Sequence, residues 1–298
     1  MSPNVAASVR ARLLNKGQAS ERFLYRLGAS GLRKRFVLKG AGLLATWMDD
    51  PYRATRDLDL LAFGPSDEAS IRAVVETICA VPCPEDGLRF DLASLDISPI
   101  RAAEEDPGQR AVFRAYLGTA KIRLQVDFGF GDAVASGPVD AEYPVLLAGL
   151  PHPRLLTYPR VASIAEKFEA MVQLGRRNGR MKDFHDVWGL SSQFSFDGPG
   201  LREAVFTCFE RRGTAWTPEV PDILTPAFYR DAEIQPRWSA YVRGGTFRAD
   251  PPAAFAIIGE RIVQFLGPVR SSVVAERPFD TVWPAGGPWT SETKESAE

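Results

Sequence analysis

The stretch FVLKGAGLLATWMDDPYRATRDLDLLAFG, residues 36–64, decides the fold of the first half of the chain. Its pattern predicts a strand over Phe36–Lys39, a glycine turn opening a helix over Gly42–Met48, and a second strand over Asp57–Phe63. Side chains two residues apart in a strand point to the same face, so Asp57 and Asp59 are expected side by side. Two carboxylates so close repel each other unless a cation neutralises them, although many such pairs are solvated loop residues. The pair therefore indicates a site for a hard cation such as Mg²⁺.

The glycine turn before the helix is a candidate phosphate-binding element. Gly40 and Gly42 allow the backbone to approach a ligand closely, and the first N–H groups of a helix attract an anion. A turn of this kind, followed closely by a carboxylate pair, suits a nucleoside triphosphate that carries Mg²⁺.

The composition is that of a globular protein without membrane spans. Of 298 residues, 45% are hydrophobic and 24% are charged, and no apolar run reaches the length of a transmembrane helix. The N-terminus lacks the apolar run of a signal peptide, and the three cysteines show no metal-ligand spacing beyond one C-x3-C, so we expect free thiols and a cytoplasmic protein. A net charge of −1 excludes a globally basic nucleic-acid binder and leaves room for local basic patches.

Helices alternate with strands over residues 1–150, which predicts an α/β (α+β) domain with a mixed sheet flanked by helices. Its last strands lie in LRFDLASLDISPI, residues 88–100, and AVFRAYLGTAKIRLQVDFGFGD, residues 111–132, where polar and apolar residues alternate. Residues 151–298 are expected to form a mainly helical C-terminal domain. Its tail after about residue 267 is rich in proline, glycine and serine and is predicted to be flexible.

Asp127 is a candidate third carboxylate. It shares the polar face of its predicted strand with Lys121, Arg123 and Gln125, and it lies just before a Gly-Phe-Gly turn. Beside the first carboxylate pair it would complete a site for two metal ions. The alternative is an aspartate that only caps the turn.

Lys167 falls inside the apolar stripe of the helix VASIAEKFEAMVQLGR, residues 161–176, rather than opposite it. Its ammonium group either extends to the rim of the helix or points into a site, where Asp183 is the best candidate partner. For a lysine in a largely apolar stripe, Lys167→Met is expected to cost little stability.

A charged cluster follows in RRNGRMKDFHDVWGL, residues 176–190. Arg176, Arg177, Arg180 and Lys182 lie close to two aspartates, which is typical of a solvated turn with ion pairs. The alternative is a basic cluster that binds phosphates, with Asp183 orienting a lysine or arginine. The two histidines are too few for a histidine-based metal site, and His185 is predicted on the surface of its helix.

Four of these segments occur in the order seen in the AbiEii/AbiGii toxin family, which the chain resembles. They are KGAG with RATRDLDLL, then VDFGFGD, then EKFEA, then RMKDFHDV. The family consists of nucleotidyltransferases of the DNA polymerase β-like superfamily, related to the MenT-type toxins. The resemblance implies a nucleotidyltransferase α/β domain over residues 1–150, and a helical domain over residues 151–298 that contributes Lys167 and Asp183 to the site.

The activity implied by the resemblance is Mg²⁺-dependent transfer of a nucleoside monophosphate from an NTP, with release of pyrophosphate. In characterised relatives the acceptor is the 3′ end of tRNA, and the added nucleotides block aminoacylation. The chain would then be the toxin of a toxin–antitoxin system, with a cognate antitoxin encoded nearby. Two other interpretations remain open: a transferase that modifies a small molecule, such as an antibiotic, or a protein, and a non-enzymatic module that binds nucleotide or RNA.

The family's functional residues carry over to this sequence where the motifs match. The expected catalytic residues are Asp57, Asp59, Asp127, Lys167 and Asp183, of which the first three are the expected metal ligands. Nucleotide binding is expected from Lys39, Gly40, Ala41, Gly42, Arg56, Lys167 and Arg180. The acceptor's backbone is expected to meet Arg33, Lys34, Arg35, Arg176 and Arg177. The chain departs from the family at residues 40–42, where the hydroxyl side chain that touches a phosphate is missing and backbone N–H groups must serve instead.

Overall fold

The computed structural model describes residues 3–48, 57–100, 108–132, 134, 137–245, 247 and 250–291, with side chains from Lys16 onward. The chain divides into two compact units, Met1–Asp132 with Pro138–Tyr158, and Ala133–Gly137 with Pro159–Glu298. The first unit extends beyond residue 150 because a strand near Tyr158 belongs to its sheet.

The first unit is built on a mixed sheet, as the sequence predicts. The described strands follow the order β3-β4-β5-β2-β1-β7-β6, in which β2 runs parallel to β5 and β1 runs parallel to β7. The strands are β1 (Phe36–Lys39), β2 (Leu58–Ala62), β3 (Leu88–Ile100), β4 (Gly108–Leu117), β5 (Ala120–Gly129), β6 (Val139–Glu142) and β7 (Arg154–Thr157). The helices are α1 (Pro3–Ala29), α2 (Leu44–Trp47) and α3 (Glu68–Cys79), with 3-10 helices at Arg33–Arg35, Gly40–Leu43 and Pro84–Asp86.

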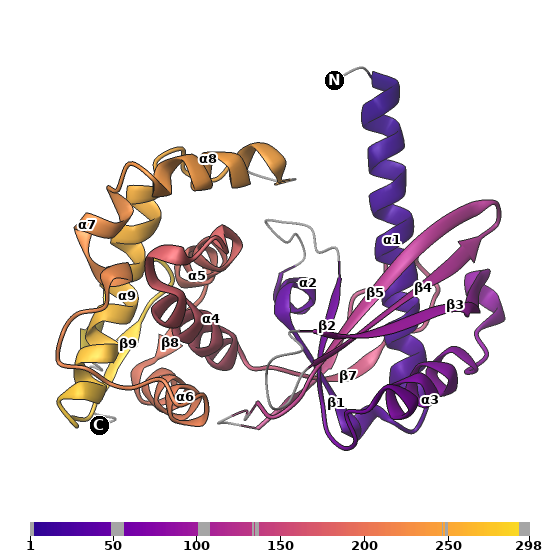
Figure 1. Ribbon diagram of the computed structural model, residues 1–298, viewed down its shortest axis with the longest axis horizontal. Coiled ribbons are helices and arrows are strands. Elements are labelled where there is room, and N and C mark those ends of the chain that lie inside the picture. The colour runs from indigo at the N-terminus through magenta and orange to yellow at the C-terminus, as the bar shows by residue number, and fades with distance from the viewer. Residues whose placement is uncertain are drawn as a thin grey trace, which may run out of the picture. The chain divides into compact units, whose positions relative to one another are not determined.

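The alternation of side chains in β4 and β5 gives the sheet one apolar and one polar face. Phe113, Leu124 and Val126 are buried on the apolar face, and α1 and α3 lie beside the sheet (Figure 1). Phe23 of α1 packs on Phe113 with ring centroids 5.7 Å apart. The opposite face is therefore left to the polar residues of the same strands.

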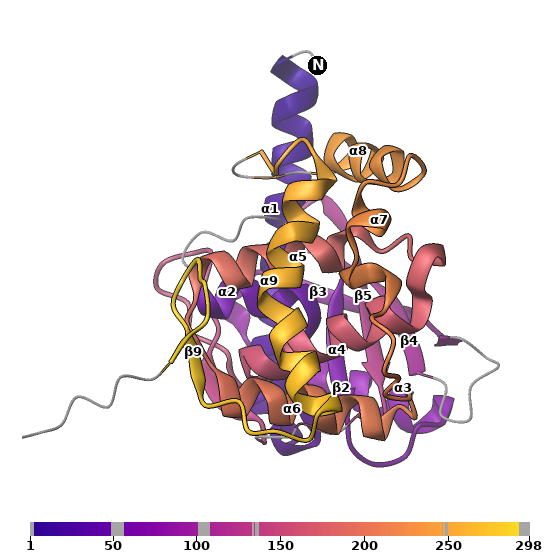
Figure 2. The ribbon, with the colours of Figure 1, turned by 90° about the vertical axis from the view of Figure 1, so that its left-hand side faces the viewer.

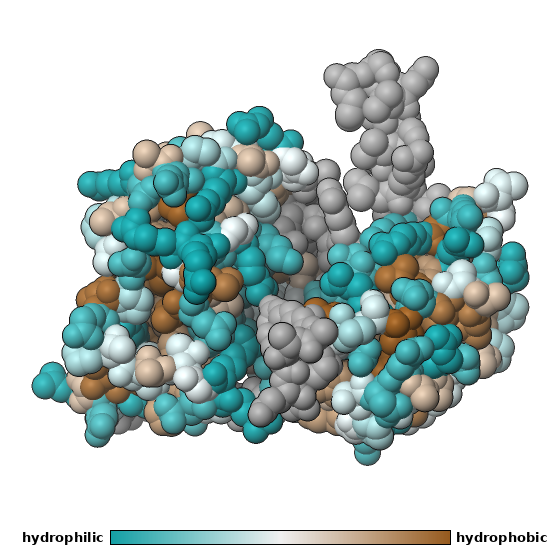
Figure 3. All heavy atoms as spheres, in the orientation of Figure 1, coloured by the Kyte–Doolittle hydropathy of each residue, from teal (hydrophilic) through white to brown (hydrophobic). Residues whose placement is uncertain are grey.

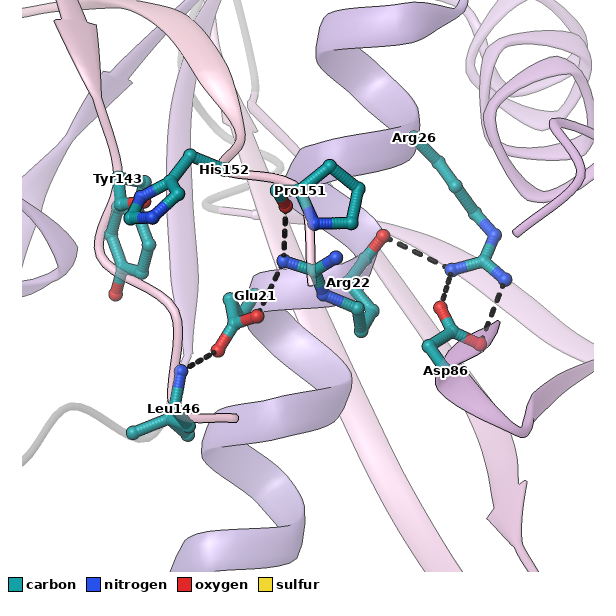
Figure 4. Close-up of polar contacts among 8 residues, drawn as sticks. All are labelled: Glu21, Arg22, Arg26, Asp86, Tyr143, Leu146, Pro151 and His152. Atoms are coloured by element: carbon teal, nitrogen blue, oxygen red, sulfur yellow. Dashed lines mark hydrogen bonds and ion pairs between the residues drawn. The ribbon is translucent and has the colours of Figure 1, made fainter. Parts of the chain in front are cut away.

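Buried ion pairs fasten α1 within the first unit, and no sequence pattern points to them. The carboxylate of Glu21 pairs with Arg22 at 2.5 Å and accepts a hydrogen bond from the backbone N–H of Leu146 at 2.7 Å. Arg26 forms a 2.5 Å ion pair with Asp86, just before β3 (Figure 4). Because Glu21, Arg22, Arg26 and Asp86 are all buried, each charge needs its partner for the fold to be stable.

The second unit is mainly helical. Its helices are α4 (Arg160–Leu174), α5 (Met181–Gln193), α6 (Gly198–Arg211), α7 (Pro226–Tyr229), α8 (Ile234–Gly244) and α9 (Phe255–Val274), with 3-10 helices at Gly175–Arg177 and Asp222–Leu224. In Figure 2, α9 lies along the group formed by α4, α5 and α6. Aromatic residues fill this core, with Phe168 and Phe209 at 5.3 Å and Phe184 and Phe255 at 5.2 Å between ring centroids.

The prediction of a flexible tail after residue 267 is wrong for the residues described up to Ser291. Helix α9 continues to Val274, and β9 (Thr281–Trp283) pairs with β8 (Phe196–Asp197) and β10 (Thr290–Ser291). The side chain of Trp283 is completely buried, and its indole N–H donates to the carbonyl of Ser191 at 2.7 Å. The buried tryptophan fixes a segment whose proline and glycine content indicates flexibility.

Within the described part of the chain, no helix is long and apolar enough to span a membrane. The face drawn in Figure 3 shows hydrophobic residues in small groups among hydrophilic ones.

Candidate active site

Four charged residues form a row across the polar face of the sheet. Asp59 in β2 lies in register with Asp127 in the parallel strand β5. On the outer sides of this pair, Arg110 in β4 is in register with Asp127, and Lys39 in β1 is in register with Asp59. The two predicted carboxylates are thus neighbours at the centre of the sheet, with a protein cation on each side.

Arg110 forms a bidentate ion pair with Asp127. Nε donates to one carboxylate oxygen at 2.8 Å, and Nη2 donates to the other at 2.7 Å. The hydrogen bonds to Asp127 raise the pKa of Arg110 above its ordinary value, and the nearby charges of Asp57 and Asp59 act in the same direction. The guanidinium group is therefore bound to Asp127 and is influenced by the charges of the other two carboxylates.

Asp57 lies immediately before β2, two residues from Asp59. Its carboxylate is half exposed and lies 3.4 Å from the ammonium group of Lys16 in α1. This contact is longer and more solvated than the pair formed by Asp127 and Arg110.

The glycine turn predicted after β1 brings the backbone against Asp59. Gly40 has a φ of +67°, and a Cβ atom placed there would lie 2.2 Å from a carboxylate oxygen of Asp59. Only glycine fits both the backbone conformation and the space. In place of the predicted helix Gly42–Met48, the structure has the 3-10 helix Gly40–Leu43 followed by the single α-helical turn of α2.

Lys39 is held inside the first unit. Its ammonium group lies 2.5 Å from the carboxylate of Asp132 and over the ring of Tyr158, 5.5 Å from its centroid. This pairing gives the predicted nucleotide-binding lysine a partner within the protein. Arg56, the other basic residue predicted to bind nucleotide next to the aspartates, lies outside the described residues.

The carboxylates fit a divalent cation only in part. Among the described residues, no group of three or more His, Cys, Asp or Glu side chains is arranged to hold a metal ion. Asp127 is turned to Arg110 instead, which removes the third of the expected ligands. Asp57 and Asp59 remain a pair of carboxylates, and one or two carboxylates suffice for Mg²⁺ when substrate phosphates complete its coordination.

Lys167 in the second unit points inward, and its partner is a pair of aspartates on α5. Its Nζ lies 2.9 Å from Asp183 and 2.8 Å from Asp186. The lysine side chain is 13% exposed and both aspartates are 1% exposed. Arg180 adds a second cation, with its Nε 2.7 Å from the other oxygen of Asp183. The expected contact with Asp183 is present, and Asp186 is a partner that sequence reasoning missed.

His185 is buried, so the prediction of a surface position on its helix is wrong. It is 1% exposed, and its Nδ1 lies 2.9 Å from the hydroxyl oxygen of Tyr241 in α8. The rings of Trp188, Trp238 and Phe247 lie within 5.9 Å of it, centroid to centroid. The histidine is buried because α8 packs against α5 and covers that side of the helix.

Several arginines expected to meet an RNA backbone have partners within the protein. Arg33 pairs with Asp140, and Arg35 donates to the carbonyl of Phe63. Arg176 is fixed by Asp231 at 2.5 Å and Asp222 at 2.9 Å, which raise its pKa. Lys34 and Arg177 are exposed.

The structure adds a basic face that the sequence analysis did not single out. Arg123 and Lys121 share a face of β5 with Asp127, and Arg114 lies in register with Arg123 on β4. Arg89 in β3 lies over the ring of Tyr116, 4.6 Å from its centroid. We define the basic face as the exposed residues Arg89, Arg114, Lys121 and Arg123. Two carboxylates, Asp91 and Asp96, lie along its β3 edge.

Solved structures show the class of protein that this fold defines. The chain is similar to MenT4, a nucleotidyltransferase toxin from Mycobacterium tuberculosis H37Rv, with a TM-score of 0.53 and 20% identity over 84% of this chain and 82% of that one. It is also similar to a candidate nucleotidyltransferase from H. pylori, with a TM-score of 0.51 and 13% identity over 88% and 99% of the two chains. The mixed sheet and its helical C-terminal part form a nucleotidyltransferase fold.

The family follows from the sequence. Residues 22–260 match the family model described as nucleotidyl transferase AbiEii toxin, type IV TA system. The chain belongs to this family and is a nucleotidyltransferase toxin of a type IV toxin–antitoxin system. No curated protein matches the sequence significantly.

Proposed function

We propose that the protein transfers a nucleoside monophosphate from an NTP to the 3′ end of tRNA and so blocks aminoacylation. The observation that carries this proposal is the register of Asp59 with Asp127, two residues from Asp57 and directly beside the glycine turn. Carboxylates at this point of a nucleotidyltransferase fold suit a reaction at a triphosphate.

Asp57 and Asp59 would hold Mg²⁺. When bound, the ion supplies charge neutralisation for the triphosphate and for the departing pyrophosphate. The turn at Gly40, Ala41 and Gly42 would contribute backbone N–H groups to a phosphate. Arg110 would first have to release Asp127. Asp127 would then serve either as a further metal ligand or as the group that takes the proton of the attacking hydroxyl.

Lys167 and Arg180 would bind the β- and γ-phosphates. Lys167 is oriented by two buried aspartates, so its ammonium group is preorganised rather than free to rotate. Asp183, which accepts a hydrogen bond from Lys167 and forms an ion pair with Arg180, then acts by positioning both cations.

The basic face supports a polymeric anion as the acceptor. From Asp127 to Lys121 along β5 the rise is six residues, or roughly 20 Å, which several phosphates of an RNA strand would cover. Arg114 and Arg123 lie beside each other in register, with Asp91 opposite Arg114 on β3, and an anion between the two arginines would reduce the repulsion that Asp91 does not offset. A small molecule would need no such surface, although the overall charge of −1 is compatible with one.

A cognate antitoxin encoded nearby is the expected partner, since the chain belongs to a toxin–antitoxin family. The cytoplasm, where NTPs and tRNA meet, is the compartment in which this activity would operate.

The acceptor is identified by offering each candidate to the protein in parallel reactions. The protein is incubated with Mg²⁺ and α-labelled NTPs, together with total RNA, an aminoglycoside or a protein extract. We expect label in the tRNA fraction, and we expect expression of the protein, but not of Asp57→Ala, to arrest bacterial growth. Label on the aminoglycoside or on protein would support the alternative transferases, and absence of label everywhere would support a binding module.

A further inference from the structure

Arg110 lies beside Asp127, the third of the expected metal ligands, and binds both of its oxygens. The row Arg110, Asp127, Asp59 and Lys39 has protein cations at its ends and carboxylates at its centre. Lys39 is already paired with Asp132 outside the row. Arg110 is paired with a carboxylate of the row itself, Asp127.

The geometry of this pair leaves Asp127 poorly suited to coordinate a metal. Its two oxygens accept the 2.8 Å and 2.7 Å bonds from Arg110, and one of them also accepts a 3.3 Å bond from the amide of Gln125. A planar guanidinium group that binds both oxygens of a carboxylate uses the lone pairs that a metal ion would need. Asp57, in contrast, has the longer 3.4 Å contact with Lys16 and is more exposed than Asp127.

Charge balance favours one divalent cation at this site. Three carboxylates, Asp57, Asp59 and Asp127, already have two protein cations in contact, Arg110 at Asp127 and Lys16 at Asp57, so one divalent ion more than offsets the remaining negative charge. A second divalent ion would add further positive charge next to Arg110, which is bound to Asp127.

We propose that Arg110 is the built-in second cation of the active site: it positions Asp127 and keeps it from metal coordination, so that the protein binds one divalent cation, through Asp57 and Asp59. Arg110 is 40% exposed, which leaves the guanidinium group accessible to a substrate phosphate. The inference rests on the proposed nucleotidyl transfer and specifies the metal content of its site.

The test is the number of Mn²⁺ ions bound by the full-length protein, measured by calorimetry and by the EPR signal of free Mn²⁺. Wild-type protein and Asp127→Asn should each bind one ion with affinities within about threefold of each other. Asp59→Asn should bind none at this site. Arg110→Met frees Asp127, so this variant should bind a second ion, and its melting temperature should rise more on addition of Mn²⁺ than that of the wild type.

Two further variants separate this role from a structural one. Arg110→Lys keeps a cation at the site, so this variant should bind one Mn²⁺ ion, as the wild type does. Arg154→Met removes another cross-strand arginine–carboxylate pair, with Glu142 at 2.7 Å, and should leave both the count and the Mn²⁺ response as in the wild type.

The inference is overturned if the wild type binds two Mn²⁺ ions and Asp127→Asn loses one of them. The result does not depend on transfer activity. A protein that binds one ion in this pattern but labels no acceptor contradicts the proposed function and leaves the inference standing. If Arg110→Met does not fold, the numbers of Mn²⁺ ions bound by the wild type, Asp127→Asn and Arg110→Lys still show whether Asp127 coordinates a second ion.

Discussion

Asp59 of β2 and Asp127 of β5 lie in register on neighbouring parallel strands, although 68 positions separate them in the chain. The pairing of β2 with β5 is what brings the second and third predicted carboxylates together. The DLDLL and VDFGFGD motifs thus meet at a single place in the sheet, and the function of each depends on the strand order rather than on either motif alone.

Replacing Gly40 by alanine should disable the site. The new Cβ would lie 2.2 Å from a carboxylate oxygen of Asp59, and the φ of +67° is unfavourable for a side chain. We expect a loss of stability of about 1–3 kcal/mol from the backbone alone and a loss of transfer of at least roughly tenfold as Asp59 is displaced. Circular dichroism melts and transfer rates measure the two effects separately.

Gly118→Ala is the matched control for this substitution. Gly118 has a φ of +55° in the turn between β4 and β5, and a Cβ atom placed there would meet nothing within 4 Å. It should show a similar loss of stability with transfer intact. Equal loss of transfer in both variants would mean that backbone strain, not contact with Asp59, is responsible.

Lys167→Met should destabilise the protein, in contrast to the expectation from the apolar stripe of its helix. The ammonium group is shared by two carboxylates that are each 1% exposed, and its removal takes a cation away from both. Breaking a buried ion pair in this way costs about 3–5 kcal/mol. Chemical denaturation should show this loss, and the stabilisation of the protein by NTP should shrink with it.

Lys182→Met is the control, because Lys182 is an exposed lysine on the same helix α5 as the two aspartates. It should change stability by less than about 0.5 kcal/mol. If Lys167→Met is equally harmless and NTP still raises the melting temperature as in the wild type, Lys167 neither supports the fold nor binds phosphate.

Reversing two charges of the basic face should weaken RNA binding without affecting the nucleotide. For Arg114→Glu/Arg123→Glu, the slope of log affinity for tRNA against log salt concentration should fall by about 2. NTP-induced stabilisation should be unchanged. Arg243→Glu/Arg277→Glu makes the same change in net charge on exposed residues of the second unit, and a similar fall in that variant would show that only overall charge matters.

The cysteines of the first unit should be inert in the folded protein. Burial raises the pKa of Cys79 to about 12 and also raises that of Cys83, so the reactive thiolate is scarce at about pH 8. Alkylation near that pH should be slow until denaturant is added. Because the folded state holds the Cys79 proton more tightly than the unfolded state, this group stabilises the fold below about pH 9, and the contribution is lost as the pH rises toward about 12. Cys79 is only half-buried and Cys83 is buried, so fast labelling of Cys83 in native buffer would contradict this prediction most directly.

Local patterns were sufficient to predict β1 to β5 and the polar face that carries Asp127, whereas β6 and β7 were missed. Strict alternation in β4 and β5 fixes which side chains share a face, and that periodicity is visible in the sequence. The stripe of α4 likewise showed that Lys167 could point inward. Such features depend on residues close together in the chain.

The partners of these residues could not be predicted in the same way. Arg110 and Asp127 meet through the register of β4 on β5, and the alternation that places Asp127 on the polar face also places Arg110 there, a signal that sequence reasoning did not use. Asp186 and Asp183 are three residues apart on one helix face, which could have indicated a shared partner. The burial of His185 depends on α8, and the order of the C-terminal segment depends on Trp283, so both required tertiary contacts.

The most direct test of the central claim is the fate of the tRNA 3′ end. Wild-type protein and Asp59→Asn, shown by circular dichroism to be equally folded, are incubated with Mg²⁺, α-labelled NTPs and total tRNA, and the labelled ends are mapped and then tested for aminoacylation. The wild type should add nucleotides to the 3′ end and abolish charging, and Asp59→Asn should do neither. Equal labelling by the two proteins would contradict the assignment of the catalytic aspartates. No label on tRNA with the wild type would contradict the assignment of the acceptor.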